Sequence, residues 1–145
     1  MKLNRQQFLD DLRHLATLEI PWLHQGDNPE VGFDCIGVLK YTAELQVKLP
    51  DELVKEFAAY HRPPNGNHLL ATMRKWFVEI DPKDRQPADL IQCFVRRNPC
   101  HMAVEMGDGL IAEAFENTTG VSRFMIWPLP SDRRIAACFR IPDEF

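Results

Sequence analysis

The hydrophobic pattern of this 145-residue chain changes its period at Pro82, and no other feature constrains the fold as strongly. Before Pro82, apolar residues recur every three or four positions, as they do on the buried face of an α-helix. After it, short apolar runs alternate with turn residues, a pattern typical of antiparallel strands. Helices followed by strands predict an α+β fold in which the helices pack on one face of a sheet.

The pattern predicts four helices and a C-terminal antiparallel sheet of about five strands. The helices begin at Asn4, near Asp34 and at Pro50, the third ends near Tyr60, and a fourth contains Leu69 to Trp76. The expected strands are 90–95, 101–106, 110–115, 121–127 and 135–141. No repeat, low-complexity segment or long linker divides the chain, so we expect one domain over residues 1–145.

Charge and hydropathy argue against two classes of function. A net charge of -4 leaves no basic excess to neutralise a phosphate backbone, so we expect no binding to nucleic acid. The first 18 residues are interrupted by charges and lack the apolar run of a signal peptide or a membrane span. We therefore expect synthesis in the cytoplasm, no membrane insertion, and another export route if the substrate lies outside the cell.

The segment GFDCIGVL, residues 32–39, places a cysteine at the start of a predicted helix. Asp34 is a suitable N-cap, and Cys35 then occupies the first helical position. There the helix dipole and unpaired backbone N–H groups favour a thiolate, lower its pKa, and can hold an oxyanion. Gly37 destabilises a helix by about 1 kcal/mol relative to alanine, so we expect a close neighbour there, the strand that carries the base.

The predicted partner of Cys35 is His101, at the start of a strand in the hairpin of residues 99–116. An imidazole base needs a third group that fixes its tautomer. If residues 107–109 form a three-residue turn, His101 faces Phe115 and Glu113 lies diagonally within reach. A two-residue turn would instead bring Glu116 opposite His101. We favour Glu113, and Glu116 remains the alternative.

The four cysteines show no CxxC pair and no dense disulfide spacing, so we interpret them as reduced thiols. Zinc could be bound by Cys93, Cys100 and His101, but this spacing is unlike that of common structural zinc sites. We expect neither a metal nor a cofactor.

Taken in order, these segments resemble the NlpC-type family of cell-wall cysteine peptidases, which have a papain-like fold. IPWLHQG (20–26) is similar to the family's Pro-Tyr-x-Trp-Gly-Gly element, GFDCIGVL to its Asp-Cys-Ser-Gly motif, and QPADLIQCF (86–94) to its Gly-Asp-Leu-Val strand. HMAVEMGDGLIAEA (101–114) resembles the histidine hairpin, whose third catalytic residue follows the histidine by twelve positions, here Glu113. Trp22 stands at the position of the family's oxyanion tyrosine, and Ile36 at that of its serine.

The resemblance implies a peptidase with Cys35 as nucleophile, His101 as base and Glu113 as orienting group. Asp34, Trp22 and Gly37 would then form the oxyanion and substrate-binding group. It also implies peptidoglycan stem peptide as substrate, cleaved between D-glutamyl and diaminopimelic acid residues. Two alternatives stay open: a non-catalytic module with the same fold, and an acyltransferase or amidase on a substrate outside the wall.

The closing segment RRIAACFRIP (133–142), with Gly120 and Val121, is similar to the version of this family found in bacteriophage tails, prophages and gene-transfer particles. Such an origin implies phage tail proteins as partners. It would also explain how a chain without a visible signal peptide reaches the wall.

Overall fold

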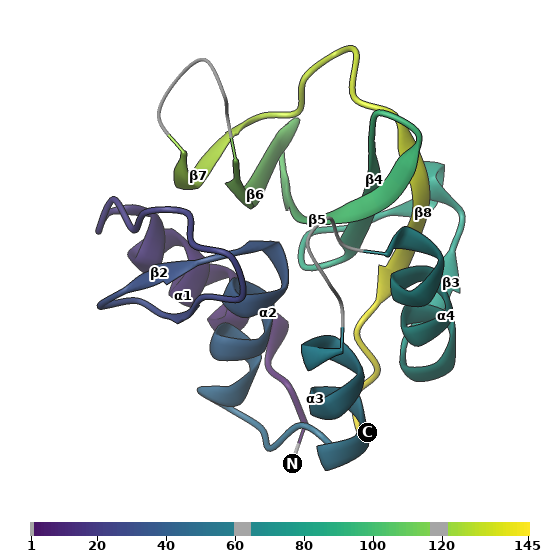
Figure 1. The fold of residues 1–145 in the computed structure, drawn as a ribbon, viewed down its shortest axis with the longest axis horizontal. Coiled ribbons are helices and arrows are strands. Elements are labelled where there is room, and N and C mark those ends of the chain that lie inside the picture. The colour runs from purple at the N-terminus through teal and green to yellow at the C-terminus, as the bar shows by residue number, and fades with distance from the viewer. Residues whose placement is uncertain (1, 60–64, 117–121) are drawn as a thin grey trace.

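A computed structural model describes residues 2–59, 65–116 and 122–145 of the chain (Figure 1). The helices are α1 (Arg5–Ala16), α2 (Cys35–Glu44), α3 (Asp51–Ala58) and α4 (Gly66–Trp76), with a short 3-10 helix η1 (Pro82–Asp84). The strands are β1 (Asp27–Asn28), β2 (Gly32–Phe33), β3 (Val78–Ile80), β4 (Leu90–Val95), β5 (Asn98–Gly107), β6 (Leu110–Phe115), β7 (Arg123–Pro128) and β8 (Ile135–Arg140).

The predicted α+β architecture is confirmed. The main sheet is antiparallel and has six strands in the order β3-β8-β4-β5-β6-β7, and the helices lie against one side of it (Figure 1). The sixth strand, β3, was not expected because it is only three residues long and largely exposed. The two-residue strands β1 and β2 form a separate small ribbon before α2.

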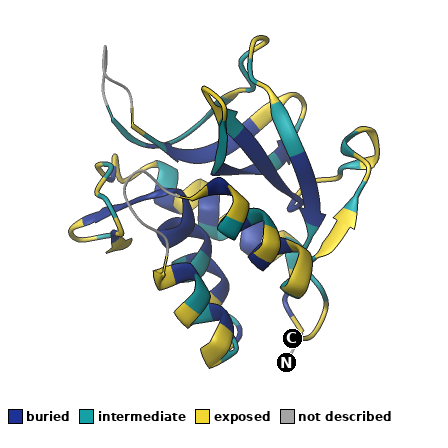
Figure 2. Ribbon diagram, turned by 45° about the vertical axis from the view of Figure 1, so that its right-hand side comes forward, coloured by how far each residue is buried: buried dark blue, intermediate teal, exposed yellow. Residues whose placement is uncertain are grey.

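The main core fills the space between the helices and the sheet. The inner faces of the helices and most of the sheet are buried, whereas the outer helix faces are exposed (Figure 2). In α1 the predicted apolar stripe is buried at Phe8, Leu9, Leu12 and Leu15. Leu18 follows at the same helical spacing, but α1 ends at Ala16 and Leu18 is 51% exposed.

A second, smaller apolar cluster lies on the other face of the sheet. It consists of alternate residues of the central strands, with partly buried side chains packed around them: Ile91, Cys93, Ala103, Ile111 and Cys138, with Ile80, Trp127, Leu129 and Ile135. Because side chains alternate along a strand, this face is also the one to which His101 and Glu113 belong.

The hairpin of β5 and β6 has the register that the sequence predicted. Val104 faces Ala112 and Glu105 faces Ile111. The turn differs from the expected three-residue loop, because Gly107 pairs with Leu110 and leaves only Asp108 and Gly109 between the strands. A register shift between Glu105 and Gly107 compensates for the shorter turn, so a bulge restores the pairing.

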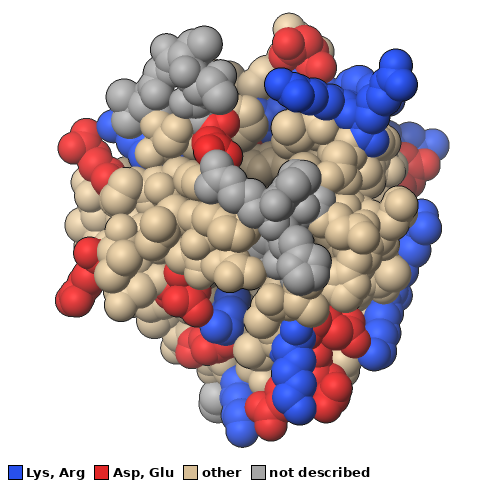
Figure 3. Space-filling model, in the orientation of Figure 1, with Lys and Arg blue, Asp and Glu red and all other residues tan. Residues whose placement is uncertain are grey.

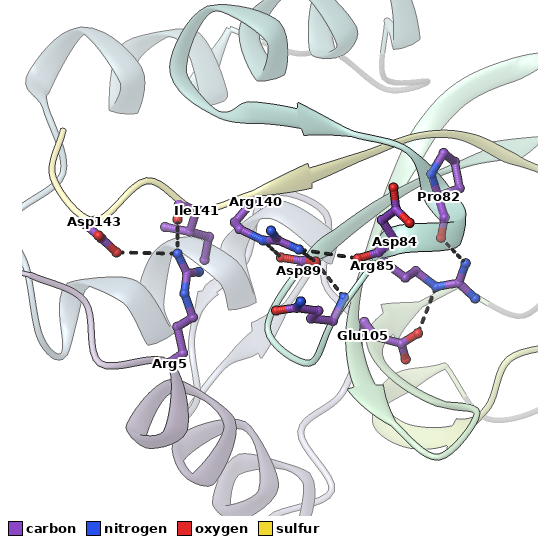
Figure 4. Close-up of polar contacts among 10 residues, drawn as sticks. Arg5, Pro82, Asp84, Arg85, Asp89, Glu105, Arg140, Ile141 and Asp143 are labelled. Atoms are coloured by element: carbon purple, nitrogen blue, oxygen red, sulfur yellow. Dashed lines mark hydrogen bonds and ion pairs between the residues drawn. The ribbon is translucent and has the colours of Figure 1, made fainter.

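Two arginines make contacts that join distant segments of the chain (Figure 4). Arg140 of β8 binds both carboxylate oxygens of Asp89, at 2.9 and 2.7 Å, and Asp89 is only 1% exposed. Arg5 of α1 donates to the carbonyl oxygen of Ile141 at 2.7 Å. The Arg5 contact holds the start of α1 beside the chain that follows β8, so the N- and C-terminal segments lie close together (Figures 1 and 2).

Several sequence features fall outside the described residues, namely Gly120, Val121, Tyr60 and residues 61–64 of the loop before α4. Within the described segments, no helix has the length and apolar character needed to cross a membrane.

Candidate active site

Cys35 occupies the first position of α2, as the sequence predicted. The helix is capped by Asp34, whose Oδ1 accepts a 2.7 Å hydrogen bond from the Gly37 N–H. The other carboxylate oxygen, Oδ2, accepts from the Gln25 N–H at 2.8 Å. Asp34 is 3% exposed, so its carboxylate connects α2 to the preceding loop and both oxygens are already bound.

Gly37 has a close neighbour, but not the one we expected. A Cβ added there would lie 1.6 Å from the carbonyl oxygen of Gly26, so α2 packs directly on the backbone that leads into β1. The expectation that Gly37 makes room for the strand carrying the base is therefore wrong. Gly37 instead fixes the loop of residues 20–26 against the start of α2.

The thiol of Cys35 reaches the β5 backbone at the two residues that flank His101, Cys100 and Met102. Its Sγ lies 4.0 Å from the carbonyl oxygen of Cys100, and α2 packs against both β5 and β6. The pairing of β5 with β6 stops at Val104 and Ala112. Beyond that point the backbone of β5 is free of its β6 partner, and the start of α2 approaches it there.

The environment of Cys35 raises the pKa of its thiol, contrary to the lowering expected from the helix dipole. Burial is the largest cause, because Cys35 is only 8% exposed and a thiolate is poorly solvated there. The carboxylates of Asp34 and Glu113 raise the pKa further, whereas a hydrogen bond from the Met102 backbone lowers it. A lone thiolate is thus unfavourable, and its formation requires a cation beside it.

His101 is held by Glu113 from the neighbouring strand. Its Nε2 lies 2.6 Å from Glu113 Oε1, and the ring packs edge-on against Phe115 with centroids 5.3 Å apart. Glu116, the alternative partner, is exposed. The prediction that Glu113, and not Glu116, contacts the imidazole is therefore confirmed. Because Nε2 is bound, Nδ1 is the nitrogen left to meet a thiol.

Two further residues bind Glu113, and the sequence did not reveal either of them. Arg133, from the loop between β7 and β8, donates to Oε1 at 2.7 Å and to Oε2 at 3.0 Å. The indole Nε1–H of Trp127 donates to Oε2 at 2.6 Å. Both carboxylate oxygens thus accept two hydrogen bonds each, although the Glu113 side chain is fully buried. Arg133 stands next to Arg134, and no local pattern distinguishes the two.

The partners of Glu113 keep it ionised. Burial alone would raise the pKa of this carboxyl group, but hydrogen bonds from His101 and Arg133, together with their charges, lower it to about 2. Glu113 is therefore a carboxylate at neutral pH. Its negative charge is paired with the guanidinium of Arg133, whose side chain is only 9% exposed.

Trp22 lies in the loop before the nucleophile, where its N–H donates to the Ser122 carbonyl and its backbone forms a bridge with Phe33. The ring is partly buried, and its centroid is 6.4 Å from that of His24. A role for the indole as a donor to substrate stays a prediction. Among the described residues, the backbone N–H of Cys35 has no acceptor, as expected for the first residue of a helix.

The described part of the chain contains no group of three or more His, Cys, Asp or Glu residues arranged to hold a metal ion. Cys93 lies opposite His101 in the pairing of β4 with β5, and burial raises the pKa of its thiol to about 11. Its neighbour is the Arg133 guanidinium, which acts in the opposite direction. Cys93 is thus a buried thiol of the second cluster.

The sequence matches no protein-family model and no curated protein. Solved structures do match. The NlpC/p60 domain of the peptidoglycan hydrolase SagA superposes with a TM-score of 0.65 at 15% identity, over 96% of this chain and 100% of that one. An NlpC/p60 family protein from Bacillus cereus gives 0.65 at 18% identity, over 98% of this chain and 42% of that one.

A third match is the peptidoglycan hydrolase RipB from Mycobacterium tuberculosis, with a TM-score of 0.59 and 18% identity over 98% of this chain and 68% of that one. The chain therefore spans the whole of some matching structures and less than half of others. At these identities the likeness concerns the fold. The chain has the papain-like fold of NlpC/p60 domains.

Proposed function

We propose that the chain is a cysteine peptidase that hydrolyses amide bonds in the stem peptides of bacterial peptidoglycan. Cys35 is the nucleophile, His101 the general acid and base, and Glu113 the group that orients the imidazole. Two of the solved structures that share the fold carry the name peptidoglycan hydrolase. The observation that carries the proposal is the approach of the Cys35 sulfur to the backbone flanking His101, whose far nitrogen is bound by Glu113.

The proposed reaction begins when the thiol of Cys35 transfers its proton to Nδ1 of His101. The sulfur attacks the carbonyl carbon of the substrate amide, and the imidazolium gives its proton to the leaving amine. Water, deprotonated by His101, then hydrolyses the thioester and releases the acid. Because burial raises the pKa of Cys35, the thiolate forms only together with the imidazolium cation beside it.

The oxyanion of the tetrahedral intermediate needs a donor near the sulfur. The backbone N–H of Cys35 meets this requirement, since it points from the first turn of α2 and has no acceptor within the described segments. Trp22 would supply a second donor in this proposal. Asp34 and Gly37 contribute indirectly, because they hold the loop that carries Trp22 against the start of the helix.

The test is the release of peptides from purified peptidoglycan, followed by mass spectrometry. Cys35→Ala should lower the rate by about 10³-fold or more, as loss of a nucleophile does. Cys138→Ala is the matched control, since it removes a buried thiol from β8, which β4 separates from the strand of His101, and should leave turnover unchanged. Full turnover in the Cys35 variant would end the proposal. The masses of the new ends also show whether the D-glutamyl bond to diaminopimelic acid is the one cleaved.

One observation favours a non-catalytic module instead: the burial of Cys35, which raises its pKa. Alkylation by iodoacetamide at neutral pH separates the two functions. The peptidase requires Cys35 to react faster than Cys100, although Cys100 is more exposed, and to slow when His101 is replaced by Asn. If Cys35 is alkylated more slowly than Cys100, and its rate does not change when His101 is replaced by Asn, the result favours the non-catalytic module.

We also propose that a phage-derived particle carries the protein to the wall. The similarity of RRIAACFRIP to the tail-associated version of the family supports this proposal. Mass spectrometry of particles purified by density gradient tests it. The chain should co-sediment with tail proteins, and its recovery only as free protein would contradict a tail location.

A further inference from the structure

The Glu113 carboxylate is the most completely bound side chain near the proposed site. Each of its oxygens accepts two hydrogen bonds, from His101 and Arg133 on Oε1 and from Trp127 and Arg133 on Oε2. Here a full negative charge contacts the imidazole, and a full positive charge contacts the same carboxylate.

We infer that Arg133 is a positioning residue of the proposed peptidase site: it fixes the Glu113 carboxylate and cancels its charge, so that the pair acts on His101 as a neutral acceptor would. This inference rests on the proposed function and names a residue to which neither the sequence motifs nor the fold assigns a role. It concerns how the imidazole is held and charged, not contact with substrate.

The geometry of Arg133 supports this role. The guanidinium makes a two-pronged contact with the carboxylate, an arrangement that fixes the plane of Glu113 as well as its distance. It also lies over the ring of Phe115, 5.1 Å from the centroid, and Phe115 in turn packs edge-on against His101. Arg133 thus supports the imidazole through two side chains.

Because Arg133 is buried, its charge is screened little by water and acts strongly on the neighbouring groups. Exposed Lys and Arg side chains gather along the right-hand side of the molecule in Figure 3, where water screens them. The Arg133 side chain is 9% exposed and that of Glu113 is fully buried, so their charges act on His101 with little screening. The neighbouring Arg134 is exposed and stacks on Phe94, with its guanidinium 4.6 Å from the ring centroid.

Within the described segments, other titratable groups act on this region from three elements. At the start of α2 they are the Cys35 thiol and Asp34, on β5 the Cys100 thiol, and on β4 the Cys93 thiol, which Arg133 and Arg85 influence. Glu113 acts on Cys35 in the direction that disfavours the thiolate. Loss of Arg133 would leave that carboxylate uncompensated, so thiolate formation at Cys35 would require a higher pH.

The experiment measures the rate of Cys35 alkylation by iodoacetamide as a function of pH, by mass spectrometry of the Cys35 peptide. Arg133→Met should move the midpoint of this profile to higher pH by about one unit or more, the usual effect of a nearby charge. Arg134→Met removes the same charge from the adjacent exposed side chain and should leave the midpoint in place. Arg133→Lys keeps the charge but loses the two-pronged contact, so its midpoint should remain that of the unmodified protein.

The double variant Glu113→Gln/Arg133→Met removes both charges, and its midpoint should return to that of the unmodified protein. Because it leaves no buried charge unpaired, it also carries the test if Arg133→Met fails to fold. Equal midpoints for Arg133→Met and Arg134→Met, or a double variant whose midpoint stays displaced, would overturn the inference.

Alkylation of Cys35 requires no turnover of substrate. The experiment can therefore contradict the role of Arg133 without contradicting the proposed function, and the reverse. An unmodified protein that leaves peptidoglycan intact would contradict the proposed function, whatever the alkylation profiles show. Normal hydrolysis together with a midpoint that does not respond to Arg133→Met would contradict only the role of Arg133.

Discussion

Gly37 of α2 and Gly26 of the preceding loop are in backbone contact: a Cβ on Gly37 would lie 1.6 Å from the Gly26 carbonyl oxygen. A Cβ on Gly26 would in turn lie 2.4 Å from the carbonyl oxygen of Gly32. The loop that precedes Cys35 therefore packs against α2 so closely that neither glycine leaves space for a methyl group. Asp34 holds the same two segments together through its hydrogen bonds to Gly37 and Gln25.

Gly37→Ala should destabilise the protein even though alanine is the better helix former. The clash with backbone is expected to lower the free energy of unfolding by about 1–3 kcal/mol, since the loop must move. Glu44→Ala, at an exposed position of the same helix, should stay within about 0.5 kcal/mol. Urea unfolding of the two variants gives the comparison. A Gly37→Ala protein as stable as the unmodified one would show that the loop moves freely.

Glu113→Gln should be strongly destabilising because it leaves the Arg133 guanidinium buried beside a neutral amide. Removal of one partner of a buried ion pair lowers the free energy of unfolding by about 3–5 kcal/mol. Addition of Arg133→Met should recover a large part of this loss, since no buried charge is then unpaired. Denaturant unfolding of both single variants and the double variant yields the coupling energy. Additive effects of the two substitutions would contradict the direct contact.

Acid should weaken the fold through Glu113. Its pKa in the folded protein is lowered to about 2 from an ordinary value of 4.5, so the unfolded chain binds a proton first as the pH falls. The stabilisation is complete above about pH 4.5 and is lost progressively as the pH drops toward 2. Urea midpoints measured from pH 6 to pH 2 test this. The Glu113→Gln/Arg133→Met protein should show a smaller loss over the same range.

Asp89→Asn tests the ion pair that connects the start of β4 with β8. Asp89 accepts from Arg140 through both oxygens and from the Gln86 N–H at 2.7 Å, and an amide nitrogen cannot accept these bonds. We expect a loss of about 1.5–3 kcal/mol in the free energy of unfolding, typical of hydrogen bonds to a charged group. Asp10→Asn is the matched control, because its pair with Arg13 is half exposed and should contribute less than about 1 kcal/mol.

Where a local rule applied, the sequence predicted the structure well. The cap at Asp34 placed Cys35 at the first turn of its helix, and hairpin register selected Glu113 over Glu116. The turn between β5 and β6 is one residue shorter than predicted. The bulge between Glu105 and Gly107 compensates for this difference, so the predicted register is still correct. Alternation along two strands therefore carried more information than the identity of the turn residues.

Arg133 marks the limit of such reasoning. It lies 20 residues from Glu113, in a loop, next to an arginine of the same type. Arg133 is buried against a carboxylate and Arg134 is exposed on an aromatic ring because of the path of the loop that connects the edge strand β7 with β8, on the other side of β4, β5 and β6. That path depends on contacts across the whole sheet. The raised pKa of Cys35 was missed for the same reason, since burial of the helix start depends on the strands packed against it.

The bulge between Glu105 and Gly107 has a consequence for how this protein can vary over evolution. Gain of one residue between Gly107 and Leu110, with the bulge kept, would shift the register by one and turn every side chain of β6 to the opposite face, so that Ala112 or Ala114 would take the place of Glu113 beside His101. Homologous chains that retain the Glu113 contact should therefore keep the combined length of bulge and turn, and should keep residues that accept a positive φ at the positions of Gly107, Asp108 and Gly109.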